Sequence, residues 1–557
     1  MSWLGEKPTL PNERTAIRVA LASILVFLIV QAITYQPGEP FYNNDETRHV
    51  MTGVFFRDFL GDFPIAHPRD YVIRYYLQYP ALGFPLWPPM FHFTEGLFMA
   101  LFGTSFLVSK AVVLAFAGLA CFYMFLLVRR THGGEVAALA LPLLAFTPLF
   151  FELSHQVMLE VPTLALALGA TYHFVRFLDL ERRSDLFAAA LLSALAALTR
   201  FSAVYLLPVF LFLVIARGQW RIFRRWDAYL AATLGFLLVA PFYGLTAMEV
   251  GWVYGKLASE GSAGQARPPL SLRQLAFYPS QVPGQIGWFA LAPCMIGLAH
   301  ALARSQRFRA LPYLALTGAT FLLLTPVGIR ESRYAIYWLP ALALFAAEGL
   351  HFLSGRLRMP SVYLVLGAMV VVGTAAVSLA KPVPFVRGYE AAARYVVDHT
   401  RTSRCCLFDG GLSGNFIYQV RRHDPGRKLW VLRGDKILYS VLLNPQFGYD
   451  APAKSEEEML ATIFKYDPEL IVVEEPQTFD RIAAADRFRA ILAGHHERFR
   501  LEATLPVESN RKGFANRELK IYRSLIRNPK PAERLEVDML ALRRTIQTVI
   551  PHGGPSR

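Results

Sequence analysis

The sequence predicts a polytopic α-helical membrane protein of about 11 transmembrane helices with a C-terminal α/β domain. The first observation is composition: 54% of the 557 residues are hydrophobic and 18% are charged, whereas soluble domains have about 45–50% apolar and about 25% charged residues. The second is distribution, because long apolar runs end near residue 380 and a soluble pattern follows. This composition excludes intrinsic disorder and a disulfide-rich scaffold.

The first apolar run, residues 16–35, is long enough to span a bilayer and lacks the small-residue cleavage site of a signal peptide. We therefore expect an uncleaved first helix. Further apolar runs, each ended by charges, Pro or Gly, are 106–128, 135–153, 161–178, 186–199, 202–216, 228–247, 286–303, 310–325, 335–353 and 360–380.

Charge predicts the orientation of these spans. With a cytoplasmic N-terminus, the cytoplasmic connections contain the arginine clusters Arg129-Arg130, Arg182-Arg183, Arg217 with Arg221-Arg224-Arg225, Arg304-Arg307-Arg309 and Arg356-Arg358. The positive-inside rule favours this arrangement, so the net charge of +15 needs no nucleic-acid partner. An odd number of spans then places the chain after Lys381 outside. The short cytoplasmic loops favour a bacterial inner membrane, in which this outer side is the periplasm.

Residues 87–102 are apolar but contain Pro88, Pro89, His92 and Glu95. A span here would turn the arginine clusters outward, so we expect a helix lying in the outer membrane interface.

Three regions follow from this topology. We expect residues 1–380 to form a transmembrane domain with a long first outer loop, 36–105. Residues 381–526 form a soluble α/β domain, because strand-like runs alternate with helix-like stretches. Residues 527–557 form a basic tail.

Two neighbouring carboxylates follow the first span, in Asn43-Asn44-Asp45-Glu46-Thr47-Arg48. They begin a helical stretch, and a helix N-terminus favours ionised carboxylates. These residues allow two interpretations. The carboxylates could act as catalytic acid–base groups, or Asp45 could simply be an N-cap that binds free backbone N–H groups.

A second acid, Glu160, lies two residues before Pro162 in the next outer connection, which also contains His155. Ionisable residues at membrane depth are costly and tend to be functional. The alternative is another acid in the first turn of a helix.

Three outward-facing cations stand at helix ends against the positive-inside trend: Arg200, Arg330 and Arg333. Guanidinium groups bind phosphate through paired hydrogen bonds. The alternatives are snorkelling to lipid headgroups or pairing with Glu331. Taken together, the carboxylates could deprotonate a hydroxyl and the arginines could stabilise a departing phosphate.

At this point the chain resembles the GT-C membrane glycosyltransferases of the dolichyl-phosphate-mannose protein mannosyltransferase type, which include the lipid A aminoarabinose transferases. The resemblance covers about residues 15–380 and depends on the order of the motifs. The matching stretches are Asp45-Glu46-Thr47-Arg48, Tyr79-Pro80 through Trp87-Pro88-Pro89, Met158-Leu159-Glu160-Val161-Pro162, Leu198-Thr199-Arg200, and Arg333-Tyr334 to Leu339-Pro340. Glu160 and Arg200 depart from the Asp and Lys that are common there.

The resemblance implies an inverting transfer of a sugar from a polyprenyl-phosphate donor to a lipid, glycan or protein hydroxyl at the outer face. Asp45 would be the general base, with Glu46 and Glu160 as further catalytic acids. The implied phosphate-binding residues are Arg200, Arg330 and Arg333, and the implied positioning residues are Arg48, His155 and Tyr334. No cofactor is definite; Mg²⁺ or Mn²⁺ at Asp45, Glu160 and His155 is an open alternative.

Two other functions fit an integral membrane protein. A lipid or glycan transporter or flippase would need polar groups near the bilayer midplane, whereas the ionisable residues here gather at helix ends. A non-catalytic assembly protein would work through its outer α/β domain, which has no Gly-rich phosphate loop.

Overall fold

A computed structural model describes residues 13–36, 38–39, 44–251, 271–302, 307–327, 330–357, 360–439, 454–476, 482–514, 516–539 and 544–550. The chain divides into two compact units. The helical unit comprises Met1–Tyr35, Pro85–Phe91 and Lys110–Val383, and the mixed unit comprises Gln36–Phe84, His92–Ser109 and Pro384–Arg557.

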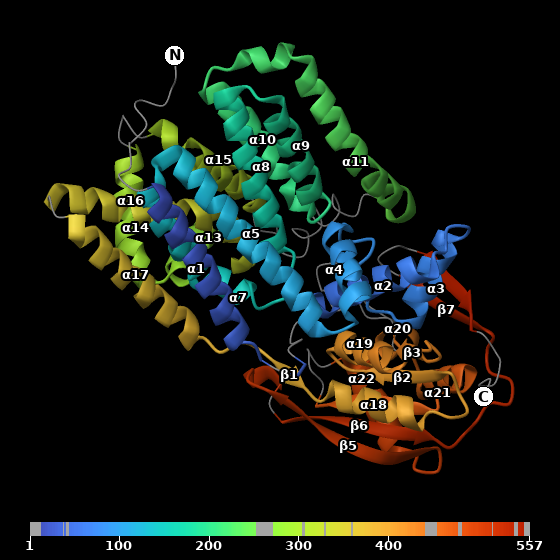
Figure 1. Ribbon diagram of the computed structural model, residues 1–557. Coiled ribbons are helices and arrows are strands. Elements are labelled where there is room, and N and C mark those ends of the chain that lie inside the picture. Colours follow the sequence, from blue (N-terminus) through green and yellow to red (C-terminus); the bar gives the residue numbers. More distant parts are fainter. Residues whose placement is uncertain are drawn as a thin grey trace. The chain divides into compact units, whose positions relative to one another are not determined.

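The helical unit is a bundle whose elements appear in Figure 1. Its α-helices are α1 (Glu13–Ile33), α5 (Phe106–His132), α6 (Gly134–Ala145), α7 (Pro148–Leu153), α8 (Glu160–Leu180), α9 (Arg183–Ala197), α10 (Leu206–Ala216), α11 (Trp226–Val250), α13 (Leu272–Ile286), α14 (Trp288–Leu302), α15 (Arg307–Leu324), α16 (Leu339–Leu357) and α17 (Pro360–Ala380). Short 3₁₀ turns are η1 (Phe201–Tyr205), η2 (Trp220–Arg224) and η3 (Ser332–Trp338).

Six of the described helical stretches are long and apolar enough to cross a membrane: Glu13–Ile33, Phe106–His132, Glu160–Leu180, Trp226–Glu249, Ser332–Leu357 and Val362–Ala380. Each apolar run of the sequence contains a helix, which confirms the mainly helical membrane fold. Several are shorter than a full span. The number of about 11 spans therefore stays a prediction.

Burial separates central from peripheral helices in this unit. Most of α8 and α16 is buried, whereas little of α11 and α17 is buried although both are apolar. Exposed apolar faces of this length are stable in lipid and costly in water.

Glycines let two central helices approach closely. A Cβ added at Gly297 of α14 would lie 1.7 Å from the Phe345 backbone oxygen, and one added at Gly349 of α16 would lie 2.0 Å from that of Pro293. Small residues at such crossings are typical of membrane helix packing, where dispersion contacts replace the hydrophobic effect.

The mixed unit contains a six-stranded sheet in the order β1-β5-β6-β4-β2-β3. Its strands are β1 (Val386–Arg387), β2 (Cys405–Asp409), β3 (Trp430–Arg433), β4 (Leu470–Glu475), β5 (Phe499–Ser509) and β6 (Arg517–Ser524). β2 pairs in parallel with β3 and β4, and β6 pairs antiparallel with β4 and β5. The helices α18 (Tyr389–His399), α19 (Ser413–His423), α20 (Gly434–Ile437), α21 (Glu456–Tyr466) and α22 (Ala483–Gly494) alternate with the strands. The predicted α/β fold is present.

The long first outer loop also belongs to the mixed unit. It forms α2 (Asn44–Asp62) and α3 (Pro68–Gln78), and most of α4 (Met90–Phe102) is in the same unit. This differs from the predicted division, which assigned 36–105 to the membrane domain. The physical reason is a buried ion pair between Asp58 of α2 and Arg421 of α19.

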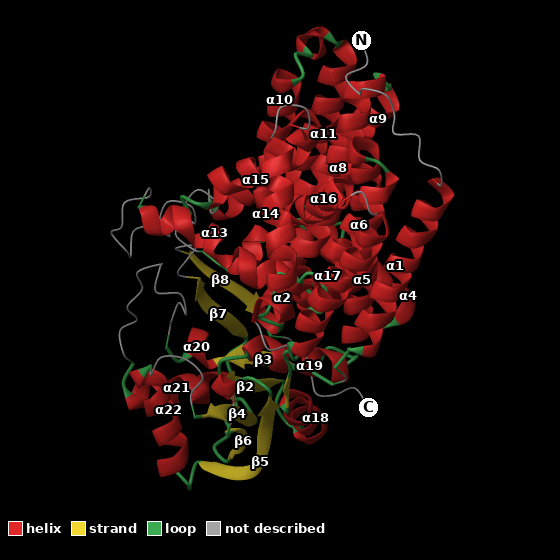
Figure 2. Ribbon diagram, turned by 90° about the vertical axis from the view of Figure 1, so that its left-hand side faces the viewer, coloured by secondary structure: helices red, strands yellow, loops and turns green. Residues whose placement is uncertain are grey.

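The predicted basic tail contains a hairpin of β7 (Arg534–Met539) and β8 (Arg544–Val549), which pair antiparallel (Figure 2). Leu535 and Val537 alternate with charged neighbours and are buried in the core of the mixed unit. The basic composition concealed this period of two, so the sequence boundary at 526 differs from the structure.

Helix α4 turns its polar side chains inward. His92 and Glu95 are buried, and His92 Nε2 lies 2.9 Å from His49 Nδ1 of α2. Leu97, Phe98, Leu101 and Phe102 are exposed. An apolar face of this kind fits the predicted location at a membrane interface, which stays a prediction.

Candidate active site

The helical unit holds a buried carboxylate at the start of α8. Glu160 lies in the first turn of this helix, and its side chain is 1% exposed. Its Oε1 lies 2.5 Å from Arg200 Nη1 and 3.4 Å from Arg333 Nε. The two guanidinium groups and the helix N-terminus compensate the cost of burying this charge. The structure thus brings together three candidates that are far apart in the sequence.

The arginines are held by short connections that follow or join helices. Arg200 lies in extended backbone between α9 and η1, and Arg333 lies in η3. The Tyr334 ring lies beside both guanidinium groups, with centroid distances of 4.8 Å to Arg200 and 5.4 Å to Arg333. Glu331 completes the cluster, because its Oε2 lies 2.7 Å from Arg333 Nε. The alternative that Glu331 pairs with Arg333 is therefore correct.

Helix α13 supports the segment that carries Arg333. Gln285 Nε2 donates to the backbone oxygen and to the hydroxyl of Ser332, both at 3.0 Å. Tyr278 of the same helix is buried, and this burial raises the pKa of its hydroxyl above the ordinary value. The nearby positive charges of Arg330 and Arg200 lower that pKa and so partly offset the effect of burial. The Nε of Arg330 is buried without a hydrogen-bond partner among the described residues.

Sequence reasoning missed the buried aromatic residues around Arg200. Tyr205 and Tyr337 are both buried, with ring centroids 4.9 Å apart, and Tyr337 lies near Arg200. A tyrosine inside an apolar run was the only available signal, and it is a weak one.

His155 has a local structural role. Its Nδ1 donates to the Phe151 backbone oxygen at 3.0 Å, and its Nε2 lies 2.8 Å from Thr34 Oγ1. Burial, with a contribution from Lys110, lowers the pKa of His155 to about 4, so the ring is neutral at pH 7. Both ring nitrogens of His155 are therefore engaged by neighbouring groups in this structure. In the described part of the chain, no three His, Cys, Asp or Glu residues are grouped for a metal ion.

Asp45 and Glu46 lie in the first turn of α2, in the mixed unit. The Asp45 side chain is 29% exposed, and its Oδ1 lies 3.8 Å from Arg48 Nη1, whereas Glu46 is buried. Burial lowers the pKa of Arg48, and the Asp45 charge opposes that shift. Asp45 is therefore the acid of this pair that reaches solvent, and Arg48 lies beside it.

The C-terminal domain holds the helix that carries Asp45. Asn44 Nδ2 donates to the Gly411 backbone oxygen at 2.6 Å. A Cβ added at Gly414, in the first turn of α19, would lie 2.2 Å from Thr47 Oγ1, so only glycine permits this approach. Further along α2, Arg421 Nη2 and Nε bind both oxygens of Asp58 at 2.8 and 2.9 Å, and Tyr75 of α3 donates to Asp58 at 2.7 Å.

Two comparisons bear on this arrangement. Residues 87–244, which include Glu160 and Arg200, match the family model of the dolichyl-phosphate-mannose-protein mannosyltransferases. The structure is similar to that of ArnT from Cupriavidus metallidurans bound to undecaprenyl phosphate, with a TM-score of 0.60 and 14% identity over 92% of this chain and 99% of ArnT. The chain resembles the GT-C glycosyltransferases. The motifs predicted this resemblance, and the comparisons confirm it.

Other GT-C structures support the same fold. The apo state of ArnT matches with a TM-score of 0.58 and 13% identity over 91% of this chain and 97% of that one. The archaeal oligosaccharyltransferase AglB from Archaeoglobus fulgidus, in complex with an inhibitory peptide and a dolichol-phosphate, matches with a TM-score of 0.53 and 12% identity over 83% and 70%. No functionally curated protein matches the sequence. With its six span-length helices, the chain is an integral membrane protein.

Proposed function

We propose that the protein is a glycosyltransferase that moves a sugar from a polyprenyl-phosphate donor to a hydroxyl acceptor at the outer face of a bacterial inner membrane. The observation that carries the proposal is the buried cluster of Glu160, Arg200, Arg333 and Tyr334 in an apolar helical unit. Charged groups buried among membrane helices are expensive and mark functional sites. The similar ArnT structure holds undecaprenyl phosphate.

In the proposed reaction, the acceptor oxygen attacks the anomeric carbon of the donor sugar and loses its proton to Asp45. The bond between that carbon and the phosphate oxygen breaks, and polyprenyl phosphate leaves as an anion. Attack from the side opposite the phosphate inverts the anomeric configuration. Asp45 suits the role of base because its carboxylate reaches solvent, whereas the buried Glu46 suits a supporting role.

The arginines would supply charge to the leaving group. A phosphate anion needs no proton from a general acid, and guanidinium groups already fixed in place stabilise it without reorganisation. Glu160 would hold Arg200 and Arg333 in that position through its 2.5 and 3.4 Å contacts. Arg330, whose Nε has no hydrogen-bond partner among the residues described, would add a third cation.

We further propose a cytoplasmic N-terminus and a periplasmic mixed unit, because this orientation places the arginine clusters on the cytoplasmic side. The acceptor would be a lipid, glycan or protein hydroxyl. Mg²⁺ or Mn²⁺ dependence is tested by chelation followed by readdition of each ion.

The test is release of polyprenyl phosphate by the full-length protein in detergent from a panel of polyprenyl-phosphate sugars. We expect Asp45→Asn to abolish release and Asp45→Glu to retain part of it. Asp70→Asn is the matched control, since Asp70 is an exposed acid in the first turn of α3. Release that persists in Asp45→Asn would move the base elsewhere, and no release from any donor, with acceptors present, would favour the transporter or assembly alternatives.

A further inference from the structure

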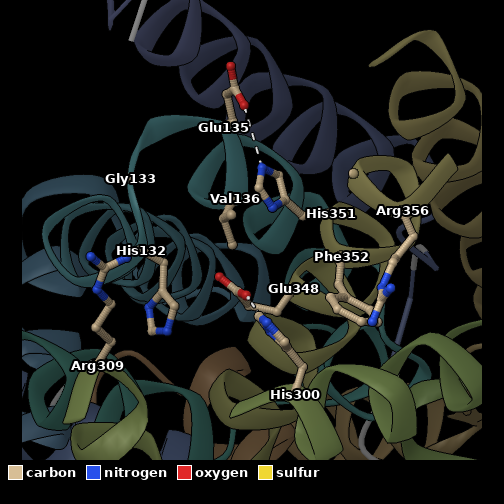
Figure 3. Close-up of a pocket in the computed structure, with 11 residues that line it drawn as sticks. His132, Gly133, Glu135, Val136, His300, Arg309, Glu348, His351, Phe352 and Arg356 are labelled. Atoms are coloured by element: carbon tan, nitrogen blue, oxygen red, sulfur yellow. Dashed lines mark ion pairs between the residues drawn. The ribbon is translucent and has the colours of Figure 1, made fainter. Parts of the chain in front are cut away.

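A cavity lined by polar side chains lies within the helical unit, away from the cluster around Glu160. It has a volume of about 430 Å³ and is lined by the C-terminal ends of α5, α14 and α16 and the first turns of α6 and α15. The lining side chains that matter here are His132, Glu135, His300, Arg309, Glu348 and Arg356 (Figure 3).

The length of α16 separates this cavity from the candidate active site. This helix begins at Leu339, directly after the 3₁₀ turn that carries Arg333, and Arg356 lies in its last turn. The α16 residues that line the cavity run from Glu348 to Arg356, nine to seventeen residues beyond Leu339, which is roughly 14 to 25 Å at 1.5 Å per residue. The cavity is therefore not an extension of the Glu160 cluster.

The carboxylates of the cavity already face histidines. His300 Nδ1 lies 3.6 Å from Glu348 Oε2, and the Nε2 of His351 lies 3.8 Å from Glu135 Oε2. Figure 3 marks both pairs with dashed lines. The ion pairs within 4 Å that these two carboxylates make are thus with imidazole rings, while Arg309 acts on Glu348 only at longer range.

The two arginines have no such partner. Across the described chain, neither Arg309 nor Arg356 makes an ion pair. Arg356 lies over the Phe352 ring at 5.6 Å, and Arg309 lies beside His132, whose ring is buried. Two guanidinium groups therefore line one cavity, and neither of them is paired with a carboxylate of the described chain.

This set of side chains selects the class of ligand. A metal ion is disfavoured, because among the residues that the structure describes no group of three or more His, Cys, Asp or Glu is arranged to hold one. Paired guanidinium forks match the geometry of phosphate oxygens, and imidazole N–H groups add donors. The volume is sufficient for a phosphate group with a small substituent.

We propose that this cavity binds a phosphate-bearing anion, held by Arg309 and Arg356. The phosphate could belong to an anionic phospholipid headgroup at the helix ends or to a small soluble phosphate compound. The proposal does not depend on the glycosyltransferase assignment.

The experiment measures ligand binding to the full-length protein purified in detergent. Native mass spectrometry and thermal unfolding would be recorded with phosphatidylglycerol, with phosphatidylcholine and with inorganic phosphate as separate probes. The variants are Arg309→Gln, Arg356→Gln and their double variant. Arg221→Gln is the matched control, because Arg221 is exposed and lies in another connection of the same unit.

Each arginine removed should weaken binding about tenfold, as expected for the loss of a charge-assisted hydrogen-bonded contact. Arg221→Gln should leave binding unchanged, which separates the cavity from general attraction of lipid to basic connections. The double variant Arg309→Lys with Arg356→Lys keeps both positive charges but loses the bidentate hydrogen bonds of the guanidinium groups. We expect it to fold and to bind the ligand with an affinity between those of the wild type and the double Gln variant.

The two sources are distinguished by the probes. Phosphatidylglycerol bound by the wild type and lost in the double variant identifies a lipid headgroup, whereas the same result with inorganic phosphate identifies a soluble ligand. Equal binding of every probe to the wild type, the double variant and Arg221→Gln would overturn the proposal, as would no binding of any probe to the folded wild type.

Discussion

Replacing Arg421 with Ala should destabilise the mixed unit more than any other single change to a charged side chain at the α2–α19 contact. Arg421 and Asp58 have side chains only 5% and 3% exposed, and the guanidinium contacts both carboxylate oxygens. Removal of Arg421 leaves the Asp58 carboxylate buried without its main partner. Breaking a buried pair in this way costs about 3–5 kcal/mol.

The structure favours the lower end of that range. Tyr75 still donates to Asp58 at 2.7 Å, and Arg57 Nη1, on a 39% exposed side chain, lies 3.0 Å from Asp58 Oδ1. We therefore expect a loss of about 3 kcal/mol. Hydrogen exchange of α2 and α19 backbone amides checks this, because such a loss accelerates exchange through local opening about 100-fold.

Arg422→Ala is the control, since the neighbouring arginine is 35% exposed and should change exchange little. The double variant Asp58→Leu with Arg421→Met should recover most of the stability, because an apolar pair needs no compensating charge. Equal exchange in Arg421→Ala and Arg422→Ala would refute the reasoning.

Three further predictions follow from other sites. Glu160→Gln should lower kcat/KM for polyprenyl phosphate release about 10- to 100-fold by loosening Arg200 and Arg333, whereas Glu152→Gln, on the preceding helix α7, should not. Gly297→Ala should prevent accumulation of folded protein, because its Cβ would meet the Phe345 backbone, whereas Gly318→Ala, with open space, should fold; size-exclusion profiles in detergent compare them. Burial raises the pKa of Glu39 from 4.5 to about 7, so the folded state binds this proton more tightly than the unfolded state. The contribution of Glu39 to the free energy of unfolding is therefore largest below pH 4.5 and is lost as the pH rises through about 7. Thermal unfolding between pH 4.5 and 8 tests this, because Glu39→Gln should remove that pH dependence.

The sequence predicted the parts of the fold that depend on local patterns. Apolar runs located the helices, and short β-rich runs located β2, β3, β4 and β6. Ionisable residues at helix ends singled out Glu160, Arg200 and Arg333 in the sequence, because charged residues are rare next to apolar runs. The structure brings these three side chains together.

What the sequence could not predict is long-range pairing. Nothing near Asp58 indicates that its partner is Arg421, 363 residues away, so the assignment of α2 to the mixed unit emerged only in three dimensions. The polar cavity was missed for the same reason. His132, His300 and Arg309 each look like an ordinary residue at a helix end, and only the packing of five helices gathers them.

The discontinuity of the mixed unit has a consequence for biosynthesis. Residues 36–84 leave the ribosome long before 384–557, and at about 5–20 residues per second the 363 residues between Asp58 and Arg421 require roughly 20 to 70 s. During that interval Asp58 of α2 lacks Arg421, its bidentate partner, while the first span is already made. The mixed unit must therefore close after translation of nearly the whole chain, and a truncation before residue 384 would leave the helix that carries Asp45 without the surface that holds it.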